Sequence, residues 1–178
     1  MIVLAHPAQD SFANPLSASN DARGSRHMTM PVYGRILLAV DGGASARRAT
    51  QEAITLATLG DAHVHAVYVV HKWGLAPYAG YYDPEALGRV LNEDGRLALD
   101  EARRAMTAQR VACSVEICET LGKSDSIAEC LLRCAKMHEA DVIVIGTHGR
   151  HGVSRAVLGS VAEGLLRIAS RPVLVVRG

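Results

Sequence analysis

Aromatic residues and net charge are both scarce in this sequence. Phe, Trp and Tyr make up 4% of the 178 residues, and 19 basic side chains are balanced by 18 acidic ones, which leaves a formal net charge of +1. Proteins that bind nucleic acid or anionic membranes rely on a basic surface, and those that bind single strands also rely on aromatic stacking. The composition therefore argues against nucleic acid and membranes as partners.

Long apolar runs are absent as well. No stretch approaches the ~18 consecutive apolar residues of a membrane span. The opening run Met1–Ala5 is too short for the core of a secretory signal and has no basic leader. The overall composition, 49% hydrophobic and 21% charged, is ordinary for a soluble globular protein. We therefore expect a cytoplasmic protein.

Cysteine pairs of the C-x-x-C type are also missing. The four cysteines are Cys113, Cys118, Cys130 and Cys134, and we expect them to be reduced thiols. Cys130 and Cys134 lie one helical turn apart. This spacing suits either a metal or redox pair or two small side chains buried in a core.

The first 30 residues differ in composition from the rest of the chain. Between Pro7 and Met30, Ser, Asn, Asp and Ala are frequent and no apolar period is sustained, which is typical of a disordered tail. Within it, Gly24–Met28 resembles a cloning remnant, and Met28 or Met30 is a candidate natural start. We expect residues 1–30 to be a tail or an extension and residues 31–178 to form the folded domain.

From Gly34 onward, apolar runs typical of strands alternate with the period of helices. Four β-branched residues in succession, 142–145, are typical of a strand buried on both faces. The βαβαβαβαβ order predicts an α/β fold, a doubly wound five-stranded parallel sheet with helices on both faces. The expected strands are 35–40, 63–70, 114–119, 142–145 and 173–176, and the expected helices are one ending at Gly60, then 84–110, 125–139 and 160–169.

Three glycines and a serine follow the fourth expected strand at the spacing G-x2-G-x9-G-S. They are Gly146, Gly149, Gly159 and Ser160. Glycine at the first two positions permits close approach of the main chain to a bulky anion and, where needed, a positive φ. A helix that opens at Gly159-Ser160 directs N–H groups and its positive dipole end toward a polyphosphate. The other interpretation is a helix capped by Ser160 and Glu163 beside an empty loop.

Asp41 directly follows the first expected strand. If the first and fourth strands are neighbours, its carboxylate lies beside the glycine-rich loop, where it can accept hydrogen bonds from a ribose or an adenine edge. Alternatively, Asp41 only initiates the Asp41-Gly42 turn.

One further pattern resembles a phosphate-binding motif but lacks a required part. Gly122-Lys123-Ser124 resembles the end of a P-loop. A P-loop also needs a glycine five residues before Gly122, and that position holds Ile117. Ser124 or Asp125 fits the cap of the following helix instead.

The histidine pairs 63/65 and 148/151 are candidate metal ligands by type only. No cysteine or carboxylate cluster completes either pair at a recognisable spacing, so we predict no metal site. Donation to a phosphate is another role for His148. No Ser/His/Asp or paired-carboxylate arrangement indicates a catalytic site.

Four segments of the chain, 36–42, 142–150, 158–162 and 172–176, resemble the universal stress proteins. The resemblance extends from about Tyr33 to Gly178, and the glycine spacing fits the branch of that family that binds ATP. It implies a Rossmann-like fold of the adenine nucleotide alpha hydrolase type. It also implies ATP, with or without Mg²⁺, as the ligand, and it leaves AMP, ADP or a cyclic nucleotide open.

The same resemblance implies roles for particular residues. Asp41 should lie near the ribose and adenine, Val69 should line the adenine pocket, and Ile145-Gly146 should pass under the nucleoside. Main-chain and hydroxyl contacts to the phosphates should come from the glycine-rich loop and the next helix. The expected nucleotide-binding residues are Asp41, Val69, Ile145, Gly146, His148, Gly149, Arg150, Gly159, Ser160 and Val161.

The resemblance further implies a homodimer that pairs through Val173–Val176, which would cover an apolar edge strand. One departure from the family is Asp41-Gly42-Gly43, where a serine often takes the third place. The loop 71–82, in which members vary, is expected to cover the nucleotide or contact a partner. The functions that follow are a nucleotide-sensing or regulatory homodimer, a slow ATPase or phosphoryl-transfer enzyme, or a chaperone-like interaction protein without a nucleotide.

Overall fold

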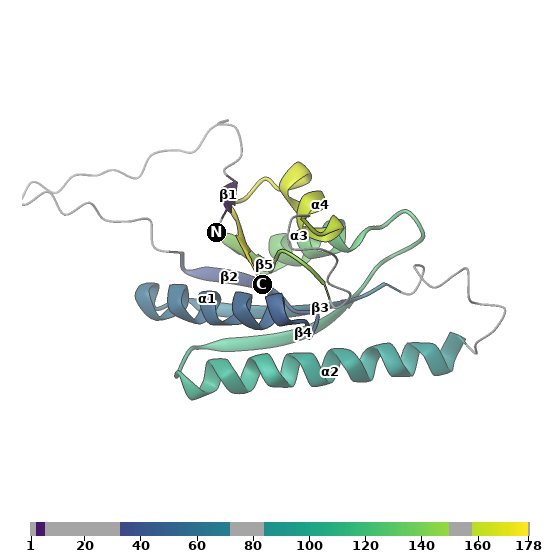
Figure 1. Ribbon diagram of the computed structural model, residues 1–178, viewed down its shortest axis with the longest axis horizontal. Coiled ribbons are helices and arrows are strands. Elements are labelled where there is room, and N and C mark those ends of the chain that lie inside the picture. The colour runs from purple at the N-terminus through teal and green to yellow at the C-terminus, as the bar shows by residue number, and fades with distance from the viewer. Residues whose placement is uncertain (1–2, 6–32, 72–83, 150–157, 178) are drawn as a thin grey trace, which may run out of the picture.

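The computed structural model describes residues 3–5, 33–71, 84–149 and 158–177, and these are built around one sheet (Figure 1). Five of its strands are parallel and lie in the order β6-β5-β2-β3-β4, which confirms the predicted doubly wound α/β fold. These strands are β2 (Arg35–Ala39), β3 (His63–Val70), β4 (Cys113–Glu119), β5 (Val142–Gly146) and β6 (Val173–Val176).

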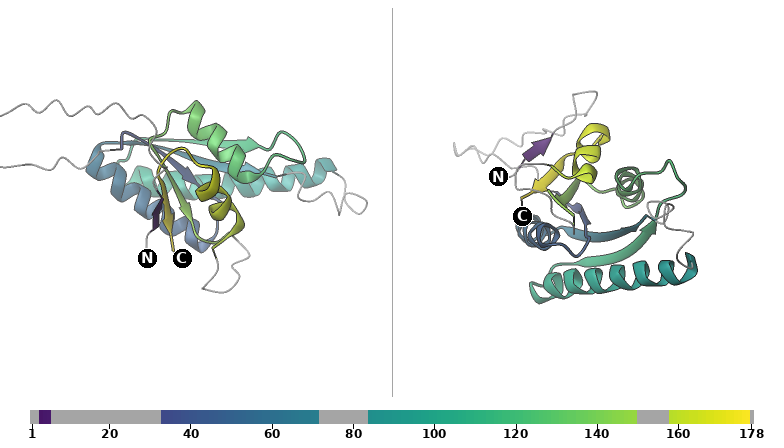
Figure 2. Two further views of the ribbon diagram at one scale, coloured as in Figure 1. Left: turned by 90° about the horizontal axis from the view of Figure 1, so that it is seen from above. Right: turned by 45° about the vertical axis from the view of Figure 1, so that its right-hand side comes forward.

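Helices cover both faces of this sheet (Figure 2). One face carries α1 (Ala44–Gly60) and α2 (Pro84–Ala108), and the other carries α3 (Ile127–Met137) and α4 (Ser160–Ile168). Pro84 begins α2, as expected for a residue that lacks an N–H. None of the helices in the described ranges is long and apolar enough to cross a membrane.

Alternate residues of the central strands point into two separate cores. Along β2, Ile36 and Leu38 join the core beneath α1 and α2, whereas Leu37 and Ala39 join the core beneath α3 and α4. All of β5 is buried, because both of its faces are covered. Each fully buried Leu or Ile side chain stabilises the fold by about 1.5–3 kcal/mol. The sheet is therefore a rigid support for the loops at its carboxyl end.

The order of the strands reverses at β2. Ile36 lies opposite Val64 of β3 on one side and opposite Val142 of β5 on the other, which confirms that the first and fourth expected strands are neighbours. After β2 the chain enters α1 on one face, and after β5 it reaches α4 on the other face. Loops that diverge in this way leave a crevice between the carboxyl ends of the two strands.

A sixth strand, β1 (Val3–Ala5), pairs with β6 in the antiparallel direction, so that Leu4 lies opposite Leu174. The sequence predicts a tail here, and the family resemblance implies that Val173–Val176 is an apolar edge strand. In the structure β6 is not the edge strand. The physical reason is that an apolar edge leaves a row of backbone N–H and C=O groups, which a further strand can pair.

The start of α3 also differs from the prediction. Ser126 is the N-cap, and its hydroxyl accepts a hydrogen bond from the Glu129 N–H at 3.2 Å. The carboxylate of Glu129 in turn accepts from the Ser126 N–H at 2.7 Å, which completes a capping box. The expected cap, Ser124 or Asp125, was placed one or two residues too early.

Candidate functional site

A cavity of about 500 Å³ lies at the carboxyl ends of β2, β3 and β5, beside the first turn of α4. Its volume falls within the range of about 300–1,000 Å³ that is common for small-molecule sites. Every described residue of the predicted nucleotide site lines it, and Arg150 lies outside the described residues. The residues brought together are Asp41, Val69, Ile145, Gly146, His148, Gly149, Gly159, Ser160 and Val161.

Sequence reasoning missed the wall that α3 contributes to this cavity. Ile127 and Leu131 of α3 line it together with Ala39 and Val67 of the sheet. The periodic apolar face of the expected helix 125–139 contained the signal, but it was read only as a core face. The wall makes this part of the cavity apolar, as is common in small-molecule sites.

Asp41 serves the turn and the cavity at once. Its Oδ1 accepts a hydrogen bond from the Gly43 N–H at 2.8 Å, which is the turn interaction proposed from the sequence. Its Oδ2 lies 3.2 Å from the place that a Cβ on Gly149 would occupy. The carboxylate is therefore beside the glycine-rich loop, and a side chain at position 149 would crowd it.

The glycines of the motif make room for the protein's own chain. A Cβ on Gly146 would lie 2.6 Å from Ser45 Oγ and 2.7 Å from the Ser45 carbonyl carbon, and one on Gly159 would lie 2.8 Å from the Thr147 carbonyl oxygen. Gly146 and Gly159 do not have a positive φ, in contrast to Gly42 at 81°. At these two positions the need for glycine is explained by close packing rather than by left-handed backbone.

The first turn of α4 has no side-chain cap. The helix begins at Ser160, and its N-cap is Gly159, which makes no side-chain cap hydrogen bond. The alternative interpretation, a capping box of Ser160 and Glu163, is wrong, because Ser160 is already inside the helix. Glu163 instead forms an ion pair with Arg167 at 2.7 Å. The positive end of the α4 dipole therefore borders the cavity, as anion binding requires.

His148 contributes an unpaired polar atom at the cavity wall. Its Nδ1 lies 2.9 Å from Thr147 Oγ1, whereas its Nε2 is buried and has no hydrogen-bond partner in the described part of the chain. An unsatisfied buried polar group costs about 1–3 kcal/mol. A ligand oxygen at hydrogen-bond distance from Nε2 would remove that cost.

The segment that resembles a P-loop has a structural role. It forms a turn between β4 and α3, where Asp125 accepts hydrogen bonds from the Leu121 N–H at 2.7 Å and from Arg133 at 2.9 Å. Together, the Arg133 guanidinium and this N–H hold the pKa of the Asp125 carboxyl below its ordinary value. These contacts fix the chain that leads into α3.

Among the described residues, neither the cysteines nor His63, His65 and His138 line this cavity. Cys118, Cys130 and Cys134 are buried in the core beneath α3, with the sulfur atoms of Cys118 and Cys134 2.8 Å apart. A third free cysteine, Cys118 of β4, thus lies beside Cys130 and Cys134, the pair considered from the sequence. His151 and the segment 72–83 lie outside the described residues, and His65 lies in a second cavity taken up below.

The chain matches the universal stress protein family over residues 32–177. The universal stress protein MJ0531 of Methanocaldococcus jannaschii is 32% identical over 149 residues, which cover 82% of this chain and 83% of that protein. The fold is the one expected from the βαβ order of the sequence. The chain belongs to the universal stress protein family.

Solved structures show the same fold. A universal stress protein family member from Burkholderia pseudomallei is 35% identical, with a TM-score of 0.66 and coverage of 83% of this chain and 98% of that one. The universal stress protein of Archaeoglobus fulgidus in complex with dAMP is 21% identical, with a TM-score of 0.58 and coverage of 82% and 98%. At 21% identity the likeness establishes the fold alone.

Proposed function

We propose that this protein binds an adenine nucleotide, with ATP as the first candidate, in the cavity between the loops after β2 and β5. The proposal rests on the convergence of three features on one cavity. These are the carboxylate of Asp41, the first turn of α4 with its glycine N-cap, and His148 Nε2, which has no hydrogen-bond partner among the described residues. The carboxylate suits a ribose hydroxyl, the helix start suits a phosphate, and the imidazole nitrogen suits a further phosphate oxygen.

The shape of the cavity suggests an orientation for the nucleotide. The adenine ring would pack between the apolar side chains of Val69, Ile145 and Leu131, and the ribose would lie at Asp41. The phosphates would extend toward the N–H groups of Gly149 and of the first turn of α4. Asp41 is the one carboxylate among the described lining residues, so Mg²⁺ would be held mainly by the phosphates.

The family supports an adenine nucleotide as the ligand class. The Archaeoglobus fulgidus relative was solved in complex with dAMP, so this fold accommodates an adenine nucleotide in that protein. The choice between ATP, ADP, AMP and a cyclic nucleotide depends on how many phosphates the α4 end of the cavity can hold. A triphosphate gains most from several converging N–H donors.

The physiological role that we propose is a nucleotide-sensing or regulatory homodimer in the cytoplasm, active in the stress response. Pairing of two copies through β6 requires β1 to leave its place, since β1 occupies the outer side of β6. Removal of residues 1–30 should therefore raise the dimer fraction in analytical ultracentrifugation. An equal dimer fraction with and without residues 1–30 would contradict competition between β1 and a second copy.

Titration calorimetry of the full chain with ATP, ADP, AMP and cyclic AMP, each with and without Mg²⁺, tests the ligand. We expect micromolar binding of ATP, which corresponds to about 8 kcal/mol. The parent protein should first be checked for nucleotide that co-purifies with it. Absence of binding by a nucleotide-free sample would refute the proposal and favour an interaction protein with an empty pocket.

Two variants, each with a matched control, test whether ATP binds in this cavity. Asp41→Ala and His148→Gln should each weaken ATP binding about tenfold, the loss expected for one hydrogen bond to a charged group. Asp100→Ala on the solvent side of α2 and His63→Gln in the second cavity, described below, should leave ATP affinity unchanged. Phosphate release measured on the same samples separates binding from hydrolysis. Turnover that disappears in either site variant would support the slow ATPase instead.

A further inference from the structure

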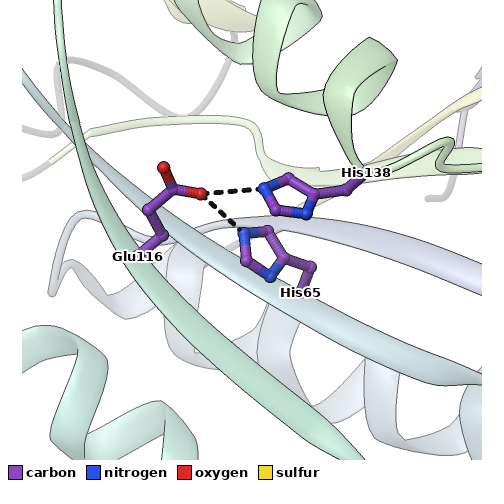
Figure 3. A group of neighbouring side chains, drawn as sticks. All are labelled: His65, Glu116 and His138. Carbon is purple, nitrogen blue, oxygen red and sulfur yellow. Dashed lines mark hydrogen bonds and ion pairs between the residues drawn. The ribbon is translucent and has the colours of Figure 1, made fainter.

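A second cavity of about 340 Å³ lies near the amino-terminal ends of the parallel strands, away from the predicted nucleotide site. Its lining includes His63 and His65 of β3, Ser114 of β4 and His138, which directly follows α3. Beside it lies Glu116 of β4, whose carboxylate contacts two of these imidazoles (Figure 3). The cluster therefore combines three elements that are far apart in the sequence.

The three side chains meet at one carboxylate oxygen. Nε2 of His65 lies 2.9 Å from Glu116 Oε2, and Nε2 of His138 lies 2.8 Å from the same oxygen. The two imidazole rings are stacked with their centroids 3.5 Å apart. One donor atom from each residue lies within 4.8 Å of the other two. Two imidazole nitrogens and a carboxylate oxygen thus converge on a volume the size of one ion.

We propose that His65, Glu116 and His138 form a binding site for a divalent transition metal ion, with Zn²⁺ as the representative ion. Two imidazoles and a carboxylate are a donor set that zinc accepts, at distances of about 2.0–2.2 Å. Donor atoms around one tetrahedral ion lie about 3.3 Å apart. The present separations of 2.8 and 2.9 Å would have to open by only a fraction of an ångström.

The room for this rearrangement is present. Because the lone pair of an imidazole nitrogen lies in the ring plane, the stacked rings must turn apart to share an ion. His138 is 36% exposed, follows the last residue of α3 and borders the cavity, so its ring has space to turn. Arg35 also lines the cavity, but its guanidinium forms an ion pair with Glu139.

A second layer of hydrogen bonds orients His65 for this role. Its Nδ1 lies 2.6 Å from Ser114 Oγ, and the same hydroxyl lies 2.8 Å from His63 Nε2. With the proton of His65 on Nδ1 and donated to Ser114, the Ser114 hydroxyl donates to His63. In the metal-bound form, Nε2 of His65 is then free of a proton and offers its lone pair to the ion. Metal-bound histidines are held by such partners on their other nitrogen.

The competing explanation is a hydrogen-bond network without metal. In that arrangement, Nε2–H groups of both histidines donate to Glu116, which accounts for the present distances. A bound ion would replace these two donations, with each Nε2 giving its lone pair to the metal and each ring keeping its proton on Nδ1. The two explanations differ in whether an ion binds, so a metal titration decides between them.

The experiment is a zinc titration of the full, untagged chain after treatment with a chelator and removal of nucleotide. Competition with a chromogenic zinc indicator should show one site of micromolar or tighter affinity. Glu116→Gln and His138→Gln should each weaken it by at least about 100-fold, more than the tenfold expected for Ser114→Ala, since outer partners contribute 10–100-fold. His71→Gln, at the opposite end of β3, should change nothing.

Cobalt replaces zinc in a second measurement that identifies the ligands. Co²⁺ bound by imidazole and carboxylate should give visible d–d absorption without near-ultraviolet thiolate charge transfer. A charge-transfer band would assign the ion to the buried cysteines and overturn the proposal. Zinc affinity that is unchanged in both Glu116→Gln and His138→Gln would overturn it as well. Circular dichroism establishes that each variant is folded, and Glu116→Gln retains a hydrogen-bond acceptor if His138→Gln is unstable.

Discussion

The two cavities described above lie at opposite ends of the same strands and are built in different ways. The cavity at the carboxyl ends is lined by main chain, small residues and apolar side chains, with Asp41 and His148 as its main polar groups. The cavity near the amino-terminal ends is lined by histidines, with Glu116 at its border. The first arrangement suits a large, partly apolar anion, and the second suits a small cation.

The helix α3 links these two regions. Ile127 and Leu131, toward its start, line the first cavity, and His138, directly after its last residue, belongs to the second. Each site therefore depends on where α3 sits on the sheet. Substitutions at one end can be used to ask whether the other end responds.

The largest effect is expected from Gly146→Val. Its side chain would overlap Ser45, including the backbone of α1, and overpacking of this kind costs about 3 kcal/mol. Urea unfolding measures the loss, and ATP binding should disappear with it. Gly122→Val is the control, because a Cβ there meets no atom within 4 Å. Equal stability of Gly146→Val and the parent would show that the chain at Ser45 can move.

Zinc should stabilise the fold by a similar amount. Occupation of one site at 100 times its dissociation constant contributes about 2.7 kcal/mol, less any binding to the unfolded chain. The thermal midpoint of the parent should therefore rise by several degrees on zinc addition, and that of His138→Gln should not. A rise of the same size in both proteins would place the ion elsewhere.

A crossed pair of variants separates the two cavities. Asp41→Ala should lower ATP affinity about tenfold, or 1.4 kcal/mol, and leave zinc affinity as it is. Glu116→Gln should lower zinc affinity and leave ATP affinity unchanged. Titrating both ligands against both variants gives four affinities, and a loss of zinc binding in Asp41→Ala would mean that the two regions are coupled through the sheet.

The smallest effect is expected at the start of α3. Ser126→Ala removes the N-cap hydrogen bond and should cost about 1 kcal/mol of unfolding free energy. Because the first turn carries Ile127, ATP affinity should fall slightly, while His138 at the far end keeps its place. Denaturant unfolding and calorimetry check these outcomes. A fall in zinc affinity would show that α3 shifts as a whole.

The fold and the first cavity were predictable because their signals are local. Apolar runs identified the strands, among them four β-branched residues at 142–145, and Gly146, Gly149 and Gly159 follow that strand at a fixed spacing. Whether Asp41 lies beside the glycine-rich loop depended on strand order, which the sequence left as a condition and the pairing of β2 with β5 meets. The cap of α3 was misplaced because Ser124, Asp125 and Ser126 are all good capping residues, and only the backbone path decides among them.

The second cavity and the edge of the sheet were not predictable in the same way. His65, Glu116 and His138 are separated by 51 and 22 positions, and only the pairing of β3 with β4 and the end of α3 bring them together. His65 and Ser114 are register partners, a relation that no spacing along one segment reveals. Likewise, a run as short as Val3–Ala5 has no periodic signal that would mark it as a strand.

The most direct test of the nucleotide proposal is a two-dimensional ¹H–¹⁵N spectrum of the labelled protein recorded during titration with ATP and Mg²⁺. We expect the largest amide shifts at Gly149, Ser160 and Val161, with smaller ones at Gly43 and Val69, and none at His65 or Glu116. The amide shifts should saturate over the ATP concentrations that the affinity from calorimetry predicts. Shifts confined to other residues, or a spectrum that ATP leaves unchanged, would contradict the proposed site.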